Sequence, residues 1–320
     1  MYGLDELKEK LEVTESWVSC PVRGCQRQVE RQRRVFRREG TFFCDDHQIY
    51  ISPTTFEYEK EEENILWDFA LLQEHMASKR ESRIARDNSE DAVTWNVFRF
   101  LEGHNLLLPY LSSLSGSSLR ETKAIYWSHD PETGKPWKSL WESRETFGEN
   151  PHRGSEPDLI ILTDRMLCFI EAKLTASNET RPSRPDNPKQ YVSGGGGWWN
   201  HVFVPSADYR QLAEQEQKYE LLRFWLLGTW IAKQHDRTFM LFNLVRDAAE
   251  KDIEARFRRW LPAEMACQFR RLSWESILHF IRSHSPEGCE KQRIIRYFAT
   301  KTVGYQKTRD EWHIQRAFSA

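Results

Sequence analysis

Residues 156–173 read EPDLIILTDRMLCFIEAK and contain two apolar runs separated by a short turn at 163–165. Each run has the length of a buried strand, and the turn between them predicts an antiparallel hairpin. Asp158 stands at the start of the first strand, and Glu171 and Lys173 stand at the end of the second. Residues two apart on a strand share a face, so the three charged side chains are expected to converge at one edge of the sheet.

This convergence predicts a metal site. Two carboxylates supply oxygen ligands of the kind that Mg²⁺ prefers, and a neighbouring lysine can hold a water molecule or a phosphate oxygen. Such a set suits metal-assisted hydrolysis of a phosphodiester bond. The alternative is that Glu171 and Lys173 form an ordinary same-face pair at a solvated edge. The apolar flanks favour the site, because buried strands seldom end in three charged groups without a use for them.

The composition indicates a folded protein. The chain has 320 residues, of which 39% are hydrophobic and 13% aromatic, so it can form one large domain or two smaller ones. No secretory signal opens the chain and no apolar window is long enough to span a bilayer, so we expect a cytoplasmic protein without a membrane association. Six cysteines in such a chain are expected to be metal ligands or buried thiols rather than disulfides.

The order of the predicted elements places the acidic hairpin inside a larger sheet. Periodicity predicts a first helix that begins near residue 88 and three strands at 122–127, 159–162 and 166–170. A second helix at 208–232 and a fourth strand at 238–245 follow. Residues 174–207 carry several prolines and the tetraglycine at 194–197, so they are expected to form a long loop insertion.

The acidic motif and this order of elements resemble the PD-(D/E)xK nuclease superfamily. The resemblance covers roughly residues 85–250. It implies an α/β fold with a restriction-endonuclease-like core, in which a mixed sheet is flanked by helices. It also implies a Mg²⁺-dependent (or Mn²⁺-dependent) endonuclease, with DNA favoured over RNA as the substrate. In that family Asp158 and Glu171 would bind the ion and Lys173 would position or activate the attacking water. The implied setting is bacterial defence or the processing of mobile elements.

Two further residues enter through the same resemblance. Many members add an acid from the first core helix, and Glu90 is the candidate here, with Glu102 as a weaker alternative. Glu90 also fits a capping box that begins at Asp87, which would give it a purely structural role. Some branches carry a Gln-x-x-x-Tyr motif on the second core helix, and Gln215 with Tyr219 matches it. That pair equally fits an ordinary amphipathic helix.

A cysteine–histidine cluster near the N-terminus predicts a structural zinc site. Cys20-x4-Cys25 and Cys44-x2-His47 supply four ligands in two knuckles, and a filled shell of four such ligands is typical of structural Zn²⁺. The alternative is four unrelated residues whose thiols are buried as small apolar groups. The close grouping favours zinc, and so short a segment would need the metal in order to fold.

The segment between the two knuckles is basic. Residues 23–38 contain seven arginines and one acid. We expect this stretch to bind the phosphates of a nucleic acid through its arginines, namely Arg31, Arg33, Arg34, Arg37 and Arg38. The alternative is that the zinc module docks a partner protein or that the arginines bridge domains.

The predicted organisation has three parts: a zinc-ribbon-like module at 1–60, a helical connector at 61–86 and a nuclease domain at 87–320. The rival hypothesis is a non-catalytic protein that binds nucleic acid, or docks a partner, on a degenerate nuclease fold. The intact set of Asp158 and the Glu171–Lys173 pair favours the enzyme. A homodimer is compatible with the sequence, since cutting both strands of a duplex commonly takes two active sites.

Overall fold

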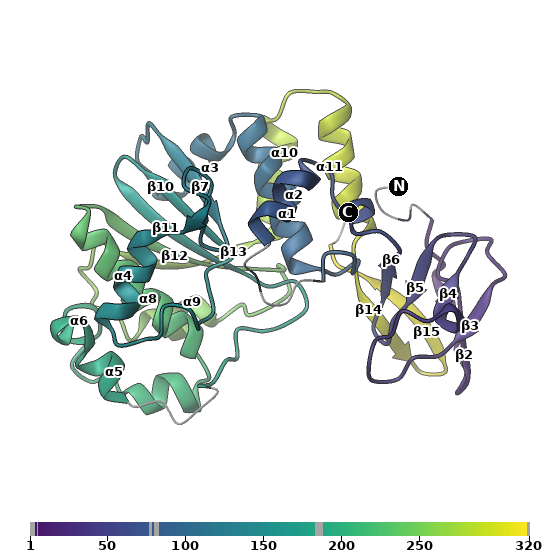
Figure 1. Cartoon of the computed structure of the whole chain (residues 1–320), viewed down its shortest axis with the longest axis horizontal. Coiled ribbons are helices and arrows are strands. Elements are labelled where there is room, and N and C mark those ends of the chain that lie inside the picture. The colour runs from purple at the N-terminus through teal and green to yellow at the C-terminus, as the bar shows by residue number, and fades with distance from the viewer. Residues whose placement is uncertain (1–3, 5, 77–78, 80–82, 183–187, 319–320) are drawn as a thin grey trace. The chain divides into compact units, whose positions relative to one another are not determined.

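The computed structural model describes residues 4, 6–76, 79, 83–182 and 188–318, and the chain divides into two compact units, each described by itself (Figure 1). The first unit comprises Met1–Glu74, Arg80–Leu106 and Ile277–Ala320, and the second comprises His75–Lys79 and Leu107–Ser276. This division differs from the three predicted segments, because C-terminal residues join the N-terminal module in one unit.

The second unit contains a mixed sheet of seven strands in the order β13-β12-β11-β10-β7-β8-β9. Strand β10 is antiparallel to both β7 and β11, whereas β12 runs parallel to β11 and to β13. The strands are β7 (Thr122–Tyr126), β8 (His129–Asp130), β9 (Lys135–Pro136), β10 (Leu159–Thr163), β11 (Met166–Ala172), β12 (Thr238–Val245) and β13 (Gln268–Ser273). The predicted hairpin and the predicted fourth strand are therefore present.

One face of this sheet is covered by helices. Alternate residues of β11 and β12, such as Phe169 and Leu241, are buried on this face together with apolar residues of α4, α7, α8 and α9. Helix α8 (Tyr219–Gln234) is buried over most of its length, and Gly228 lets it approach the ring of Phe239 in β12. The other helices are α3 (Leu107–Ser115), α4 (Lys138–Thr146), α5 (Pro188–Val192), α6 (Gly194–Gly197), α7 (Trp199–Val202), the π-helix η3 (Gln211–Gln215) and α9 (Ile253–Arg258).

The first unit combines small sheets with helices. The strands of the N-terminal module are β1 (Lys10–Leu11), β2 (Trp17–Ser19), β3 (Gln28–Glu30), β4 (Phe43–Cys44), β5 (Ile49–Ile51) and β6 (Phe56–Tyr58). The C-terminal hairpin of β14 (Thr302–Thr308) and β15 (Glu311–Arg316) pairs with β1, and its Tyr305 and Ile314 pack against the core of the module. Around these lie η1 (Gly40–Phe42), η2 (Glu61–Asn64), α1 (Phe69–Met76), α2 (Glu90–Gly103), α10 (Trp274–His284) and α11 (Cys289–Thr300).

The predicted continuous helix over 208–232 is wrong. The chain forms η3 and then breaks at Gln217, whose φ of 56° lies in the left-handed region, before α8 begins at Tyr219. The break has a physical cause in the preceding segment. Thr180 donates its N–H to the carbonyl of Gln217 at 2.7 Å, and its own carbonyl accepts from the N–H of Tyr219 at 3.2 Å. The pattern of apolar residues along the predicted helix cannot reveal this pairing with the backbone of Thr180.

The predicted loop insertion at 174–207 is also more structured than expected. Its described residues include α5, α6 and α7, whereas residues 183–187 lie outside the described part of the chain. The tetraglycine forms a tight turn in which Gly195, Gly196 and Gly197 have φ values of 58°, 70° and 80°. A Cβ at Gly195 would lie 2.7 Å from the ring of Phe147, so the turn needs glycine both for its backbone and for its packing.

Residues 61–86, predicted as a helical connector, are helical in η2 and α1 and irregular between them, with residues 77, 78 and 80–82 outside the described set. Among the described residues, no helix combines the length and the apolar character that a bilayer crossing requires.

Candidate functional site

The structure brings Asp158, Glu171 and Lys173 to one edge of the sheet. Strands β10 and β11 are antiparallel, with Leu159 opposite Ile170. Continuing this register by one residue places Asp158 opposite Glu171. The N–H of Ala172 donates to Asp158 Oδ2 at 2.8 Å, which fixes the Asp158 carboxylate beside the residue that follows Glu171. Glu171 lies two residues after Phe169 on β11, so its side chain is on the same face of the sheet, the face that α8 covers.

The Glu171 carboxylate is buried and only half satisfied. Lys173 Nζ donates to Glu171 Oε1 at 2.5 Å, and the side chains of Lys173 and Glu171 are 15% and 5% exposed. The other oxygen, Oε2, is buried without a hydrogen-bond partner among the described residues. A buried carboxylate oxygen without a donor is destabilising unless a cation or a proton meets it, so this oxygen fits a metal ligand.

Electrostatics at Glu171 point in the same direction. Burial raises the pKa of the Glu171 carboxyl well above its ordinary value, the charge of Lys173 opposes that rise, and the charges of Asp158 and Glu220 add to it. A divalent cation between the carboxylates would offset both the burial and the repulsion. Asp158 and Glu171 can therefore hold an ion such as Mg²⁺, with further positions left for substrate and water.

Lys173 is held by its backbone at the end of β11. Its N–H donates to the carbonyl of Leu244 at 2.8 Å, and its carbonyl accepts from Trp274 Nε1 at 3.1 Å. The backbone of the lysine is thus fixed from two sides, and its side chain donates to Glu171.

Two residues that the motif does not include lie beside Glu171. Asn243 of β12 is in direct register with Glu171 and is fully buried. Glu220 lies in the first turn of α8, where its N–H donates to Thr180 Oγ1 at 2.9 Å, and its charge contributes to the raised pKa of Glu171. Sequence periodicity missed both, because their proximity to Glu171 depends on the parallel register of β11 and β12 and on where α8 starts.

A buried polar cluster surrounds Asn243. Asn243 Nδ2 donates to Glu250 Oε2 at 2.9 Å, and Asn178 donates its side-chain amide to Asn243 Oδ1. Glu250 also accepts from the Asn178 N–H at 3.0 Å and lies 3.8 Å from the ammonium of Lys218. These contacts fix the strand that neighbours Glu171.

A second buried network fixes the segment before Asp158. Arg223 of α8 donates to both carboxylate oxygens of Glu149, at 2.8 and 2.6 Å, and Tyr191 donates to the same carboxylate at 3.0 Å. Arg223 also donates to Ser155 Oγ at 2.6 Å, while Arg144 donates to the Ser155 carbonyl at 2.7 Å. The chain is therefore anchored three residues before Asp158.

The two auxiliary candidates are placed differently from the acidic pair. Glu90 begins α2 in the first unit, whereas Asp158 and Glu171 belong to the second, so its role as a third metal acid stays a prediction. The capping-box alternative is wrong: Ser89 is the N-cap and accepts from the Ala92 N–H at 3.2 Å, while Asp87 binds Lys301.

Gln215 and Tyr219 do not share a continuous helical face, because the break at Gln217 separates them. Gln215 is exposed in η3, whereas the hydroxyl of Tyr219 lies 3.0 Å from that of Tyr191. A catalytic or DNA-contacting role for Gln215 therefore stays a prediction without the helical geometry that motivated it.

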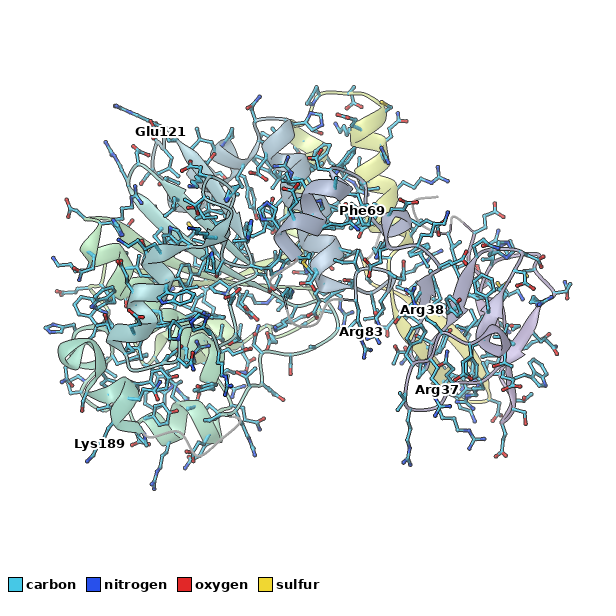
Figure 2. All side chains as sticks on the ribbon, viewed as in Figure 1. Arg37, Arg38, Phe69, Arg83, Glu121 and Lys189 are labelled. Carbon is cyan, nitrogen blue, oxygen red and sulfur yellow. The ribbon has the colours of Figure 1, made fainter. Side chains whose placement is uncertain are left out.

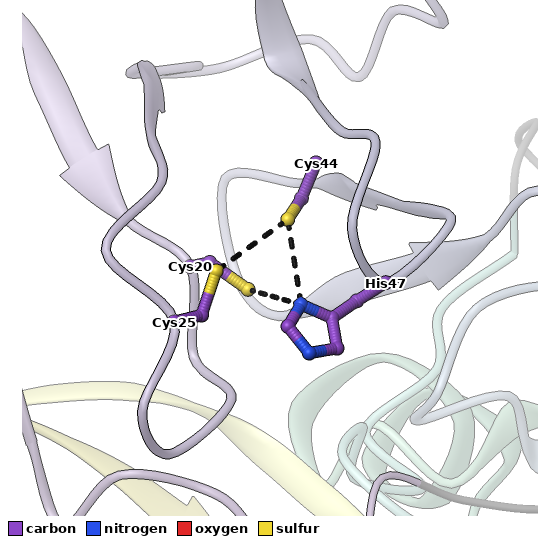
Figure 3. Close-up of side chains that lie close together, drawn as sticks. All are labelled: Cys20, Cys25, Cys44 and His47. Carbon is purple, nitrogen blue, oxygen red and sulfur yellow. Dashed lines mark hydrogen bonds between the residues drawn. The ribbon is translucent and has the colours of Figure 1, made fainter.

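The predicted zinc ligands converge in the first unit (Figure 3). One ligand atom from each of Cys20, Cys25, Cys44 and His47 lies within 4.8 Å of all the others. The turn between β2 and β3 carries the first knuckle and the turn between β4 and β5 carries the second. Two hairpin turns thus face each other with two ligands each.

The spacing of these atoms fits a tetrahedral ion. Ligands at zinc–sulfur and zinc–nitrogen distances near 2.3 and 2.0 Å lie about 3.5–3.8 Å from one another. His47 Nδ1 lies 3.6 Å from the sulfurs of both Cys20 and Cys44, and the sulfurs of Cys25 and Cys44 are 3.9 Å apart. The hydrogen bond from Cys20 and the neighbouring His47 lower the pKa of Cys44 to about 5, although burial opposes that shift. The cluster can hold zinc.

The five arginines predicted to bind nucleic acid divide into two groups by their contacts, and Figure 2 labels two of them, Arg37 and Arg38. Arg31, Arg33 and Arg38 donate to backbone carbonyls of Thr14, Glu15 and Glu59, so they stabilise the module itself. Arg34 and Arg37 are exposed, and Arg37 lies 3.7 Å from Glu39. Binding of nucleic acid by these residues stays a prediction.

Comparison with known proteins gives a family match. A family model described as restriction endonuclease associating with ARP matches residues 91–301, which is more than half of the chain. The matched range contains Asp158, Glu171 and Lys173, and it lies outside the cysteine–histidine cluster. The chain matches no curated protein and no solved structure.

Proposed function

This chain belongs to the family of restriction endonucleases associating with ARP, and on that premise we propose that it is a Mg²⁺-dependent endonuclease that hydrolyses phosphodiester bonds in DNA. The resemblance to PD-(D/E)xK nucleases agrees with the family. The observation that carries the proposal is the buried Glu171 carboxylate, which has one oxygen on Lys173, one oxygen without a donor, and Asp158 beside it. The helix and strands that hold it would then be a restriction-endonuclease-like core.

The proposed roles follow from the contacts of each side chain. When bound, Mg²⁺ (or Mn²⁺) would acidify a water molecule and offset charge on the scissile phosphate. Asp158 and Glu171 would hold the ion through the oxygens that protein donors do not occupy. Lys173, released from Glu171 when that carboxylate turns to the ion, would orient water or neutralise a phosphate oxygen. Glu90 is a proposed third acid, and Gln215 a proposed contact to the DNA backbone.

The test is a cleavage panel with plasmid, linear duplex, single-stranded DNA and RNA, each in Mg²⁺, in Mn²⁺ or in metal-free buffer. We expect DNA cleavage that requires the added ion, and a loss of at least about 10²-fold in Lys173→Ala purified in the same way. The zinc content of each preparation is measured alongside, so that loss of the structural metal is not mistaken for loss of the catalytic one. Absence of cleavage under all conditions would contradict the proposal.

We further propose that the cysteine–histidine cluster binds structural zinc and that its module binds DNA. Four protein ligands fill a tetrahedral shell, which leaves no position for substrate. The exposed arginines beside the cluster would contribute a salt-dependent attraction to phosphates. A cytoplasmic setting in defence or mobile-element processing agrees with such an activity.

A second proposal concerns a protein partner. The description of the family names an association with ARP, and we propose that this chain likewise associates with another protein, for which the zinc module is one candidate surface. A non-catalytic role on the same fold would be favoured only if Asp158→Ala and Lys173→Ala left the biological activity unchanged. Size-exclusion chromatography with light scattering would separate a homodimer from a monomer.

A further inference from the structure

The zinc module presents one apolar side chain to solvent at the tip of a basic loop. The side chain of Val35 is 69% exposed. Among the described residues, which omit 1–3, 5, 77–78, 80–82, 183–187 and 319–320, no other large apolar side chain is exposed. It lies within the sequence Arg33-Arg34-Val35-Phe36-Arg37-Arg38. Single exposed apolar residues are common, so its significance depends on how the loop holds it.

The loop is closed at its base by one buried side chain. Gln32 Oε1 accepts from the Arg37 N–H at 2.6 Å, and Gln32 Nε2 donates to the carbonyls of Arg37 and Ile51 at 3.2 and 2.7 Å. Gln32 itself is only 6% exposed. The four residues 33–36 therefore form a tip whose two ends are fixed to each other and to β5.

The sides of the tip are anchored as well. Arg33 donates to the Glu15 carbonyl at 2.8 Å, and the ring of Phe36 packs edge-on against Tyr50 with centroids 6.4 Å apart. Arg38 lies over the same Tyr50 ring at 5.6 Å. Neither Val35 nor the guanidinium of Arg34 has an anchoring contact of this kind in the described chain, so an ordered loop directs a free cation and a free apolar group outward.

We propose that residues 33–37 enter the minor groove of duplex DNA and that Val35 inserts as a wedge between two base pairs. Proteins that bind this groove read it with arginine and other polar side chains, and they frequently insert an apolar wedge that partly unstacks a base step. Arg34 and Arg37 would contact the groove and its phosphates, where the negative potential attracts arginine. This inference rests on the proposed function as a DNA endonuclease, and it adds the mode in which the duplex is held.

The chemistry of the tip favours DNA over the other partners of a basic loop. A protein interface is built around several clustered apolar anchors, and a membrane-binding surface needs a continuous apolar face. The tip exposes one apolar side chain, Val35, among arginines, which is enough for a base step and too little for either of those surfaces.

The test measures duplex unwinding, which does not require a known recognition sequence. Relaxed plasmid is incubated with full-length, zinc-loaded protein carrying Lys173→Ala, to prevent cutting, and is then treated with topoisomerase and deproteinised. Wedge insertion unwinds the duplex, so we expect a shift in linking number. Val35→Ser should abolish the shift while DNA binding persists, and Val35→Leu should retain it. Thr41→Ser, another exposed β-branched residue of the module, is the matched control and should change nothing.

Arg34→Ala supplies an independent measurement. Loss of one phosphate contact should make the slope of log affinity against log salt concentration shallower by about 0.9. A linking-number shift that is absent, or that Val35→Ser leaves unchanged, would overturn the wedge. If plasmid is cut by the wild-type chain but not unwound by Lys173→Ala, the wedge fails and the nuclease stands. If plasmid is unwound but never cut, the nuclease fails and the wedge stands.

Discussion

The cysteine–histidine cluster and the carboxylate–lysine site differ in how completely the chain supplies their ligands. Cys20, Cys25, Cys44 and His47 place four ligand atoms within 4.8 Å of one another, which is a full shell for zinc. Asp158 and Glu171 provide only two carboxylates, and Lys173 occupies one oxygen of Glu171. A complete shell stabilises a small fold, whereas an incomplete one leaves positions for water and substrate.

The two sites also differ in how they are built. The cysteine–histidine cluster is made by two short hairpin turns, each of which carries two candidate ligands close in sequence. The acidic site depends on strand register, on the start of α8 and on buried networks around Glu149 and Asn243. The folding of the cysteine–histidine cluster should therefore depend mainly on a bound metal. The geometry of the acidic site should be sensitive to many substitutions around it.

The largest effect is expected from Cys44→Ser. Structural zinc contributes about 10–16 kcal/mol to the folding of small metal-dependent modules, so loss of one ligand should unfold the N-terminal module. Zinc content by mass spectrometry should fall, and amide-exchange protection of β4 and β5 should disappear. Cys289→Ser, at an exposed cysteine outside the cluster, is the control and should leave both readouts unchanged. Full protection in zinc-free Cys44→Ser would contradict the metal-dependent fold.

A smaller effect is expected from the buried ion pair behind the acidic site. Removing one partner of a buried pair costs about 3–5 kcal/mol, so Glu149→Ala should lower the free energy of unfolding by that amount in urea titrations. The exposed pair between Lys138 and Glu142 offers a matched control, since Glu142→Ala should change stability by less than about 0.5 kcal/mol. Equal effects of the two substitutions would mean that the buried network does not anchor this region.

The same pair predicts a dependence on pH. Burial alone would raise the pKa of Glu149, but the charges of Arg223 and Arg144 and the hydrogen bonds from Arg223 and Tyr191 together outweigh it, so that the pKa in the folded protein lies below the ordinary 4.5. The unfolded chain therefore binds this proton more readily, and the stabilisation is present above pH 4.5 and lost as the pH falls through the folded pKa. Urea titrations at a series of pH values should show that the free energy of unfolding falls more steeply from neutral to acidic pH in the wild type than in Glu149→Gln.

The smallest effect is expected beside Glu171. Asn243 lies in register with Glu171, and its hydrogen bonds to Glu250 and Asn178 fix the strand beside that carboxylate. Groups outside the ligand shell that hold ligands in place typically change metal affinity by about 10- to 100-fold. Asn243→Ala should weaken Mg²⁺ binding within that range, as measured by calorimetry. Thr238→Ala, at the exposed start of the same strand, is the control. Unchanged affinity in Asn243→Ala would confine the site to Asp158, Glu171 and Lys173.

The sequence predicts the parts of the molecule that depend on local patterns. The apolar runs predict the β10–β11 hairpin, the fourth strand at 238–245 matches β12, and the acidic motif predicts the family that the comparison confirms. The cysteine spacing likewise predicts four side chains that do converge.

Features that depend on distant segments could not be predicted in this way. Periodicity over 208–232 predicts one helix, but the backbone of Thr180 pairs with Gln217 and Tyr219 and ends the helical run. The C-terminal hairpin packs Tyr305 and Ile314 on the N-terminal core, and no local pattern links segments so far apart. Glu220 and Asn243 join the acidic site through tertiary placement alone.

In the proposed nuclease, Asp158 and Glu171 together hold one divalent ion while Lys173 competes for Glu171. Electron paramagnetic resonance of Mn²⁺ titrated into the zinc-loaded chain measures this binding directly, independently of any substrate. We expect that Asp158→Asn and Glu171→Gln each lose the bound Mn²⁺ signal, whereas Lys173→Ala retains it or binds Mn²⁺ more tightly because Glu171 is released. Mn²⁺ binding that survives both carboxylate substitutions would show that Asp158 and Glu171 do not hold the ion.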